Sequence, residues 1–242
     1  MTFEDWKILA GFQMRHHGVF SGFVRSFKSH YQRRFSRTLL SRYITPTSQG
    51  LELGAGEQTI APVAQTLFSD AYATHAGAKS LAHEFFPAET IPYPNEHFDF
   101  LLNEHVLEHI PDPIRALREW KRVLKSRGVL FLFLPHPERT FDRYRQVTSL
   151  DHLREDFDRG STSSEDAHWD EWKSQVIDRG LAPHYSQYDK QASLTGNLIH
   201  RHVFVPETTR ALLESEGWTV LEVLDVVPDR SDSFAVIARV SR

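Results

Sequence analysis

The stretch Gly50-Leu51-Glu52-Leu53-Gly54-Ala55-Gly56 constrains the fold of this chain more than any other part of its sequence. It predicts a short buried strand, Gly50 to Leu53, that ends in a tight glycine turn. Glycines in such a turn let backbone N–H groups approach a ligand without a Cβ in the way. A strand, a glycine turn and a helix in succession are typical of doubly wound α/β folds, which bind nucleotide-like ligands at the carboxyl edge of the sheet.

Strand and helix patterns continue along the chain. They predict a helix from Thr59 to Phe68, a weak strand near 71–75 and a clearer strand at Phe98–Asn103. A second helix is predicted to start at Asp112-Pro113 and to end in a left-handed turn at Gly128. A strand at Val129–Leu134 follows it. The last of these is an unbroken apolar run, as expected of a central parallel strand that is covered on both faces.

The C-terminal part predicts a helix followed by two strands. The helix runs from Pro206 to Glu216, and the strands are Trp218–Val226 and Ser233–Val240. Because the link between the strands is so short, they must be antiparallel.

Two segments lie outside this alternation. Residues 1–45 look helical and basic, and we expect an N-terminal extension of amphipathic helices packed on the main domain. A lid over an anionic substrate, or contact with an acidic surface, is the alternative.

Residues 139–200 are polar and aromatic, with short helix-like pieces and no strand of core quality. We predict an inserted substrate or lid subdomain at the carboxyl edge of the sheet, within a main domain that spans 46–242.

The composition limits the kinds of chemistry and of partner that we expect for this protein. The 242 residues include no cysteine, which excludes disulfides, thiol nucleophiles and cysteine-ligated zinc. With a net charge of −4 we do not expect nucleic acid as the partner, although residues 1–45 are basic. No apolar run is long enough to span a bilayer and no signal-peptide pattern opens the sequence, so we expect a cytoplasmic protein.

Four segments, taken in their order and spacing, resemble class I S-adenosylmethionine-dependent methyltransferases. They are Glu52–Gly56, Ile91–Phe100, His105–Pro113 and Leu124–Leu130. The antiparallel strand pair at the end of the chain matches the ending of that fold. The resemblance implies a seven-stranded Rossmann-like α/β sheet with helices on both faces, S-adenosylmethionine as cofactor and methyl transfer as the activity. The same ending, and Gln58 in place of a third glycine, argue against a nicotinamide dehydrogenase.

The resemblance also implies where the cofactor binds. The acid of the first strand and the glycine turn would contact its methionine and ribose parts, and the end of the fourth strand would line the sulfonium. The residues implied are Glu52, Gly54, Ala55, Gly56, Asn103 and Glu104.

Two further cofactor contacts of the family depart from its pattern here. The acid for the ribose hydroxyls is expected about twenty residues after the glycine turn, where His75 stands, and Asp70 comes too early. The acid for the adenine amino group falls on Pro87, so neighbouring Ala88 and Glu89 would supply the contact. These departures favour, as an alternative, a non-catalytic domain that binds a cofactor or a partner through a degenerate site.

Histidines at the predicted strand ends suggest the chemistry. His105 or His136 could act as general base on an acceptor, which favours methyl transfer to a hydroxyl of a small molecule or saccharide. Alternatively, His105, Glu108 and His109 could hold divalent Mg or Mn, similar to the Glu-x-x-Glu-His ligands of small-RNA 2′-O-methyltransferases. A purely structural Glu-His pair that holds the following loop is the third reading.

The inserted segment carries further polar groups. Arg143 and Arg145 could hold an anionic group of the acceptor, or could pair with the acidic residues of the same segment. His200-Arg201-His202 forms a second polar cluster near the same edge. His152 and His168 could contact the acceptor, although for either one alone we expect a surface position.

Overall fold

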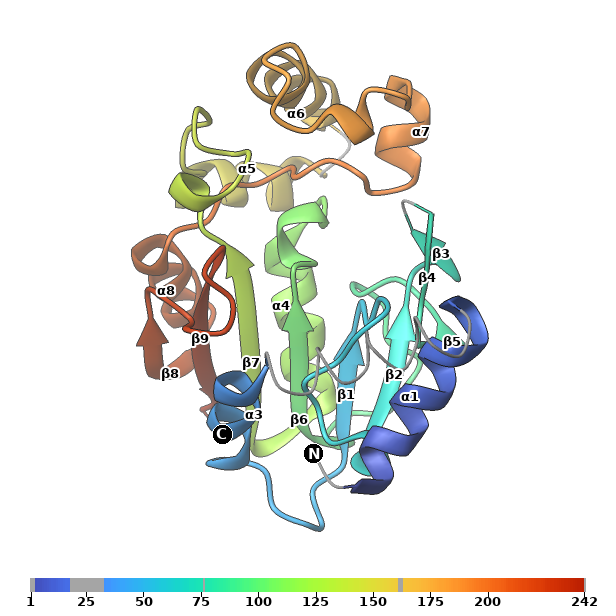
Figure 1. The fold of residues 1–242 in the computed structure, drawn as a ribbon. Helices are drawn as coiled ribbons and strands as arrows, with labels where there is room; N and C mark the ends of the chain where they lie inside the picture. Colours follow the sequence, from blue (N-terminus) through green and yellow to red (C-terminus); the bar gives the residue numbers. More distant parts are fainter. Residues whose placement is uncertain (1–2, 18–32, 76, 161–162, 242) are drawn as a thin grey trace.

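A computed structural model describes residues 3–17, 33–75, 77–160 and 163–241. Its core is a seven-stranded sheet in the order β5-β2-β1-β6-β7-β9-β8 (Figure 1), which confirms the predicted α/β fold. The strands of this sheet are β1 (Gly50–Leu53), β2 (Thr66–Asp70), β5 (Glu84–Phe85), β6 (Phe98–Glu104), β7 (Leu124–Pro135), β8 (Trp218–Leu224) and β9 (Ser233–Val240). Strands β5, β2, β1, β6 and β7 pair in parallel in that order, whereas β9 runs antiparallel to both β7 and β8, as predicted for the end of the chain.

Helix α4 (Pro113–Val123) begins where the sequence predicts. The side chain of Asp112 accepts a hydrogen bond from the backbone N–H of Arg115 at 2.9 Å, and Pro113 occupies the first turn. The predicted end at Gly128 is wrong, because the chain already enters β7 at Leu124. The left-handed residue is Arg127 (φ 63), and Gly128 serves close packing instead, since a Cβ there would lie 2.9 Å from the carbonyl oxygen of Lys125.

The helix predicted over 59–68 is wrong. Residues 59–62 form a loop, Val63–Gln65 is a single 3-10 turn, and β2 then starts at Thr66, earlier than the strand predicted near 71–75. Pro62 would interrupt a helix here, because its ring blocks the preceding turn and it has no N–H to donate. The crossover from β1 to β2 is therefore short.

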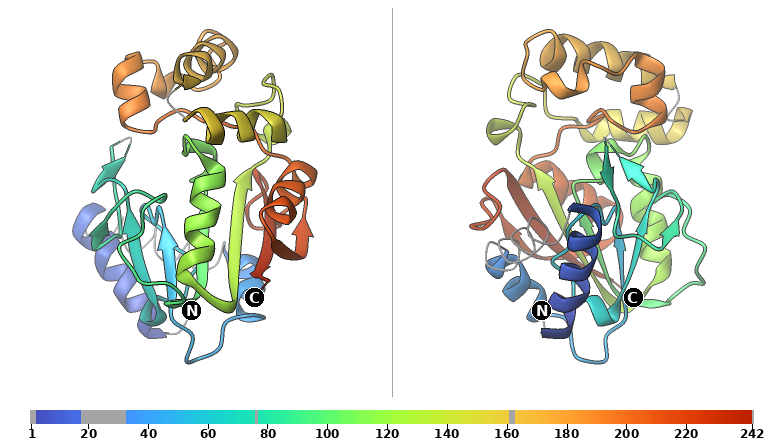
Figure 2. Two further views of the ribbon diagram at one scale, coloured as in Figure 1. Left: turned by 180° about the vertical axis from the view of Figure 1, so that it is seen from behind. Right: turned by 45° about the vertical axis from the view of Figure 1, so that its right-hand side comes forward.

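The N-terminal helices cover one face of the sheet. They are α1 (Phe3–His17) and α3 (Arg34–Ser41). Leu9, Leu39 and Leu40 share a buried cluster with Phe68 and Phe131 of the sheet, and α1 lies beside β2 (Figures 1 and 2). The part of the predicted extension at 18–32 lies outside the described residues.

The opposite face is covered by α4 and α8 (Pro206–Ser215), as seen from behind in Figure 2. Its buried cluster includes Trp120 of α4 and Leu213 of α8, packed on Leu101 and Leu132 of the sheet. Helix α8 matches the helix predicted from Pro206 to Glu216 to within one residue.

The inserted segment, residues 139–200, lies beyond the carboxyl ends of β6 and β7 (Figure 1). It contains α5 (Leu150–Arg159), α6 (Glu165–Trp172), a π-helical turn Lys173–Ile177, a 3-10 turn Pro183–Tyr185 and α7 (Lys190–Thr195). Its described residues, 139–160 and 163–200, include no strand, as the sequence predicts. Its own core is small and includes Trp172, Val176 and Ile199. Within the described part of the chain, none of the helices has the length and apolarity that crossing a membrane would require.

Candidate functional site

A cavity of about 530 Å³ opens at the carboxyl ends of β1 and β2. A small hairpin of β3 (Thr74–His75) and β4 (Ala78–Lys79) borders it. Its walls are formed by the glycine turn, residues 69–72, residues 86–89, the loop after β6 and one residue of the inserted segment, Asn197. Both the α/β core and the inserted segment therefore contribute to one site.

The glycine turn has the geometry that its sequence predicts. Gly54 (φ 71) and Gly56 (φ 52) both adopt left-handed backbone conformations, and both line the cavity. A Cβ on Gly54 would lie 2.1 Å from Cγ2 of Val106, so only glycine fits there. The N–H groups of Gly54 and Ala55 donate to the carbonyl oxygen of Ser69, which fixes the turn against β2.

Asp70, which sequence reasoning set aside, lies at the end of β2 in the cavity wall. Its carboxylate accepts hydrogen bonds from the backbone N–H of Gly56 at 3.4 Å and of Tyr72 at 3.3 Å. The expected spacing of about twenty residues presumes a full crossover helix. The short crossover brings the strand-end acid forward to position 70. His75 also lines the cavity, with Nε2 3.3 Å from the carbonyl oxygen of Asn197.

The predicted cofactor residues divide into two groups. Five line the cavity: Gly54, Gly56, His75, Ala88 and Glu89. Four belong to its surroundings instead: Glu52, Ala55, Asn103 and Glu104.

Glu52 and Asn103 are buried and do not line the cavity. Glu52 accepts a hydrogen bond from the hydroxyl of Thr59, and burial raises the pKa of its carboxyl to about 8. Asn103 is fully buried, and neither polar atom of its side chain has a hydrogen-bond partner within the described part of the chain.

Glu104 points toward the N-terminal extension rather than into the cavity. Its carboxylate accepts from Arg33 at 2.5 Å and forms an ion pair with Arg230. This network joins the residues before α3 to the end of β6 and to the link between β8 and β9.

His105 follows β6 with a left-handed backbone (φ 53), which is uncommon for a residue other than glycine. Its Nε2 lies 2.7 Å from the hydroxyl of Ser233, which itself donates to Asp232. Because that hydroxyl proton is already used, Nε2 of His105 is the donor and Nδ1 carries the lone pair. Burial lowers the pKa of His105 to about 4, so the ring is neutral at pH 7.

Glu108 is the centre of a histidine cluster. Its side chain is fully buried, and neither carboxylate oxygen has a hydrogen-bond partner among the residues described. Nδ1 of His105 lies 4.0 Å from Oε1 of Glu108, and Nε2 of His109 and Nε2 of His200 each lie 3.9 Å from the same oxygen. Burial raises the pKa of Glu108 to about 7.

The outer nitrogens of two of these rings are already used. Nδ1 of His109 lies 2.8 Å from the carbonyl oxygen of Ile199, and Nδ1 of His200 lies 2.6 Å from the carboxylate of Asp142. Because both acceptors lack a proton to give, the Nδ1 atoms donate, and each Nε2 faces Glu108. Imidazoles that ligate metals are oriented in this way by their outer hydrogen bonds. The set fits a divalent cation, with His200 added to the residues that the sequence suggested.

The other candidates lie outside the cavity wall. His136 follows β7 as predicted, but its Nε2 faces Asp225 at 3.4 Å. Arg145 is buried and pairs with Asp142 and Glu171, so of the two predicted roles it takes the one within the inserted segment.

Part of the chain matches a known protein family. Residues 51–132 match the family described as "Methyltransferase domain". Over 58 residues the chain is 43% identical to 2-methyl-6-phytyl-1,4-hydroquinone methyltransferase 1, chloroplastic, of Oryza sativa subsp. japonica. That match covers 24% of this chain, and the chain spans only 18% of the length of the rice protein.

Solved structures show the same fold. An S-adenosylmethionine-dependent methyltransferase of Thermotoga maritima, described as a possible histamine N-methyltransferase, aligns with a TM-score of 0.50 and 19% identity, over 98% of this chain and 99% of that chain. An S-adenosylmethionine-dependent methyltransferase of Methanosarcina mazei aligns with a TM-score of 0.50 and 14% identity, over 84% of this chain and 96% of that chain.

Proposed function

We propose that this chain, which carries a class I S-adenosylmethionine-dependent methyltransferase domain, transfers the cofactor's methyl group to a hydroxyl of a small molecule or saccharide. One observation carries the proposal: the cavity of about 530 Å³ lies against the glycine turn and the end of β2, where this fold holds its cofactor. Its volume falls within the range of small-molecule sites.

Asp70 is the residue we assign to the ribose. A carboxylate at the end of β2 can accept hydrogen bonds from two vicinal hydroxyls, and Asp70 faces the cavity there. The wall of residues 86–89 would lie against the adenine, with Glu89 as the polar contact.

The inserted segment would act as the lid of this site. The hydroxyl of Tyr72 donates to the carbonyl oxygen of Thr195 at 2.6 Å, and Asn197 reaches the cavity wall. A lid in this place excludes water and aligns the acceptor with the methyl group, which is most of what methyl transfer from a sulfonium requires.

The preference for a hydroxyl acceptor is supported by His105. A hydroxyl must lose its proton when it accepts a methyl group, and a neutral imidazole at the cavity wall can take it. The hydrogen bond to Ser233 leaves the lone pair on Nδ1, which would take the proton in this step.

Metal-assisted O-methyl transfer is the second candidate, favoured by the buried Glu108 cluster. Glu108, His109 and His200 would hold a divalent cation such as Mg or Mn, with Nδ1 of His105 4.0 Å from Oε1 of Glu108. Such a cation would lower the pKa of an acceptor hydroxyl. These residues would place that group beside the cavity, because His105 and His109 belong to its wall.

Turnover of methyl-labelled S-adenosylmethionine tests the proposal. The purified protein is incubated with panels of phenols, aliphatic alcohols and oligosaccharides, before and after chelation, and with Mg or Mn restored. We expect label on a hydroxyl of one panel. Loss of turnover on chelation, with recovery on addition of metal, would favour the metal-assisted form.

Cofactor binding without methyl transfer is the opposite result. Tight binding of S-adenosylmethionine with no transfer to any acceptor would contradict the catalytic proposal. It would favour the non-catalytic binding domain that the departures at His75 and Pro87 suggest.

A further inference from the structure

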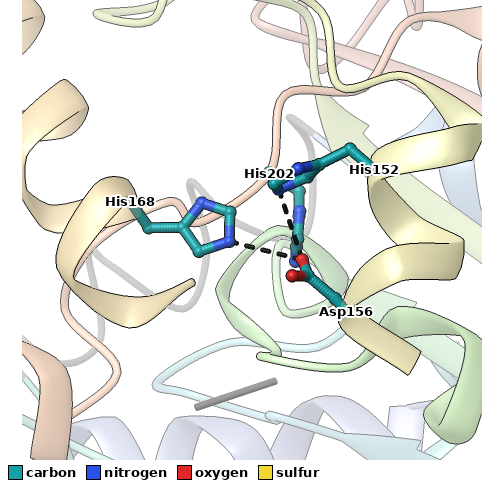
Figure 3. Close-up of side chains that lie close together, drawn as sticks. All are labelled: His152, Asp156, His168 and His202. Atoms are coloured by element: carbon teal, nitrogen blue, oxygen red, sulfur yellow. Dashed lines mark hydrogen bonds and ion pairs between the residues drawn. The ribbon is translucent and has the colours of Figure 1, made fainter. Parts of the chain in front are cut away.

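A second cluster of potential metal ligands lies in the inserted segment, separate from the cavity. It consists of His152 and Asp156 on α5, His168 on α6, and His202 on the chain that leads to α8 (Figure 3). One ligand atom from each of the four residues lies within 4.8 Å of the others. Three of these side chains are buried, including His168, for which a surface position was expected; His152 is partly exposed.

The distances already approach those of a zinc site. Nε2 of His152 lies 3.3 Å, and Nε2 of His168 lies 3.4 Å, from the same oxygen of Asp156. With Zn–N and Zn–O bonds of about 2.0–2.1 Å, the ligand atoms of a tetrahedral zinc lie roughly 3.3 Å apart. Figure 3 shows the rings of His152 and His168 directed toward Asp156 from two different helices.

Hydrogen bonds from outside the cluster orient two of its members. The hydroxyl of Ser164 donates to Oδ1 of Asp156 at 2.5 Å, which leaves Oδ2 to face the histidines. Nε2 of His202 lies 3.4 Å from the carbonyl oxygen of Pro111 and is therefore its proton-bearing nitrogen. Such outer contacts fix the ring and tautomer of metal-bound histidines.

His202 supplies an independent sign of a missing ligand. The residue is fully buried, and its Nδ1 has no hydrogen-bond partner among the residues that the structure describes. A buried nitrogen with an unused lone pair costs free energy unless it is paired or ligates a cation. The ring of His202 lies beside the other two, with its centroid 4.9 Å from that of His168 and 6.1 Å from that of His152.

We propose that His152, Asp156, His168 and His202 bind a structural zinc ion that fastens the inserted segment. Three imidazoles and one carboxylate suit zinc, and four protein ligands with no open position are typical of a structural site. The ion would join α5, α6 and the chain before α8, in a segment whose own apolar core is small and which has no cysteine for a disulfide.

His200 and His202 belong to different clusters although they are close in sequence. His200 faces Glu108, and His202 faces His152 and His168. The proposed zinc site is independent of the proposed methyl transfer, and its test involves no turnover.

Zinc stoichiometry is the test, carried out in a Glu108→Gln background so that the other cluster is weakened. The chelated protein is mixed with zinc alone, desalted and assayed for bound metal. We expect retained zinc, and the loss of one equivalent in Asp156→Asn and in His168→Gln. Asp158→Asn, on the exposed side of the same helix, and His184→Gln, also exposed, are the matched controls and should keep that equivalent.

His152→Gln covers the case in which the buried substitutions prevent folding, because this side chain is 38% exposed. It should also lose the zinc while keeping the circular dichroism spectrum of the parent. X-ray absorption of the zinc-loaded parent should show only nitrogen and oxygen ligands, with imidazole scattering. Failure of the parent to retain zinc, or zinc retained in full by Asp156→Asn and His152→Gln, would overturn the proposal.

Discussion

Glu52 is a carboxyl group held almost entirely away from water, and the Thr59 hydroxyl donates a hydrogen bond to it. Burial raises its pKa to about 8, so the folded protein keeps this group neutral at pH values where the unfolded chain ionises it. Because the folded protein holds this proton more tightly than the unfolded chain does, the contribution of Glu52 to stability is greatest at a pH below its pKa in the unfolded chain. This contribution is lost as the pH rises through its pKa in the folded protein.

We therefore predict that Glu52→Gln changes the pH dependence of stability. Between about pH 4.5 and 8, the free energy of unfolding of the wild type should fall relative to the variant, by up to about 1.4 kcal/mol per pH unit. Urea unfolding at several pH values measures this, with exposed Glu207→Gln as the control. Parallel stability curves for wild type and Glu52→Gln would contradict the raised pKa.

A second residue-scale prediction separates the two candidate bases. His105→Asn keeps a residue type that tolerates a left-handed backbone, and should lower kcat by about 10²–10⁴-fold. The dissociation constant of S-adenosylhomocysteine should stay near the wild-type value. His136→Asn should leave the rate unchanged, because His136 faces Asp225 and not the cavity. An unaltered rate in His105→Asn would exclude the proposed base.

At the scale of elements, α1 occupies the face that a crossover helix between β1 and β2 would otherwise cover. It packs Leu9 into the cluster that contains Ile60 and Phe68, and the side chain of Gln13 donates to the carbonyl oxygen of Glu57 at 2.6 Å. The N-terminal helix thus supports the chain that follows the glycine turn.

We predict that Leu9→Ala lowers the free energy of unfolding by about 2–3 kcal/mol, because a buried leucine leaves a cavity. Arg15→Ala, an exposed position on the same helix, should change it by less than about 0.5 kcal/mol. Denaturant titration compares the two. Equal effects would mean that α1 does not support the sheet.

The short crossover from β1 to β2 and the inserted segment explain why only part of the site could be predicted from the sequence. Local signals predicted the glycine turn, the start of α4 and the antiparallel ending, because each depends on residues close together in the chain. Asp70 was missed because its position depends on the length of a crossover that Pro62 shortens. His200 lies close to Glu108 because of the path that the inserted segment takes, and no local sequence pattern predicts that path.

At the scale of the whole molecule, the inserted segment and the α/β core meet around one cavity. Tyr72 reaches across to Thr195, and the side chain of Arg201 donates to the carbonyl oxygen of His109 at 2.7 Å. The backbone N–H groups of Arg201 and His202 both donate to the carbonyl oxygen of Glu108. The return of the inserted segment is thus tied directly to the loop that bears the candidate chemistry.

Removing one of these ties should loosen the lid. Tyr72→Phe loses a hydrogen bond worth about 0.5–1.5 kcal/mol, so we expect S-adenosylhomocysteine to bind about two- to tenfold more weakly. Protease cleavage within 139–200 should become faster. Tyr144→Phe, at an exposed ring of the inserted segment, is the control and should match the wild type in both assays. Unchanged affinity and unchanged cleavage would show that this contact does not hold the lid.

Calorimetric titration with S-adenosylhomocysteine tests the central claim most directly. The account predicts micromolar binding to the wild type, binding roughly 10–100-fold weaker to Asp70→Asn, because a hydrogen bond to a charged group is lost, and no change in Asp178→Asn, an exposed control. Absence of binding to the wild type, or equal binding by Asp70→Asn, would contradict the assignment of this cavity to the cofactor.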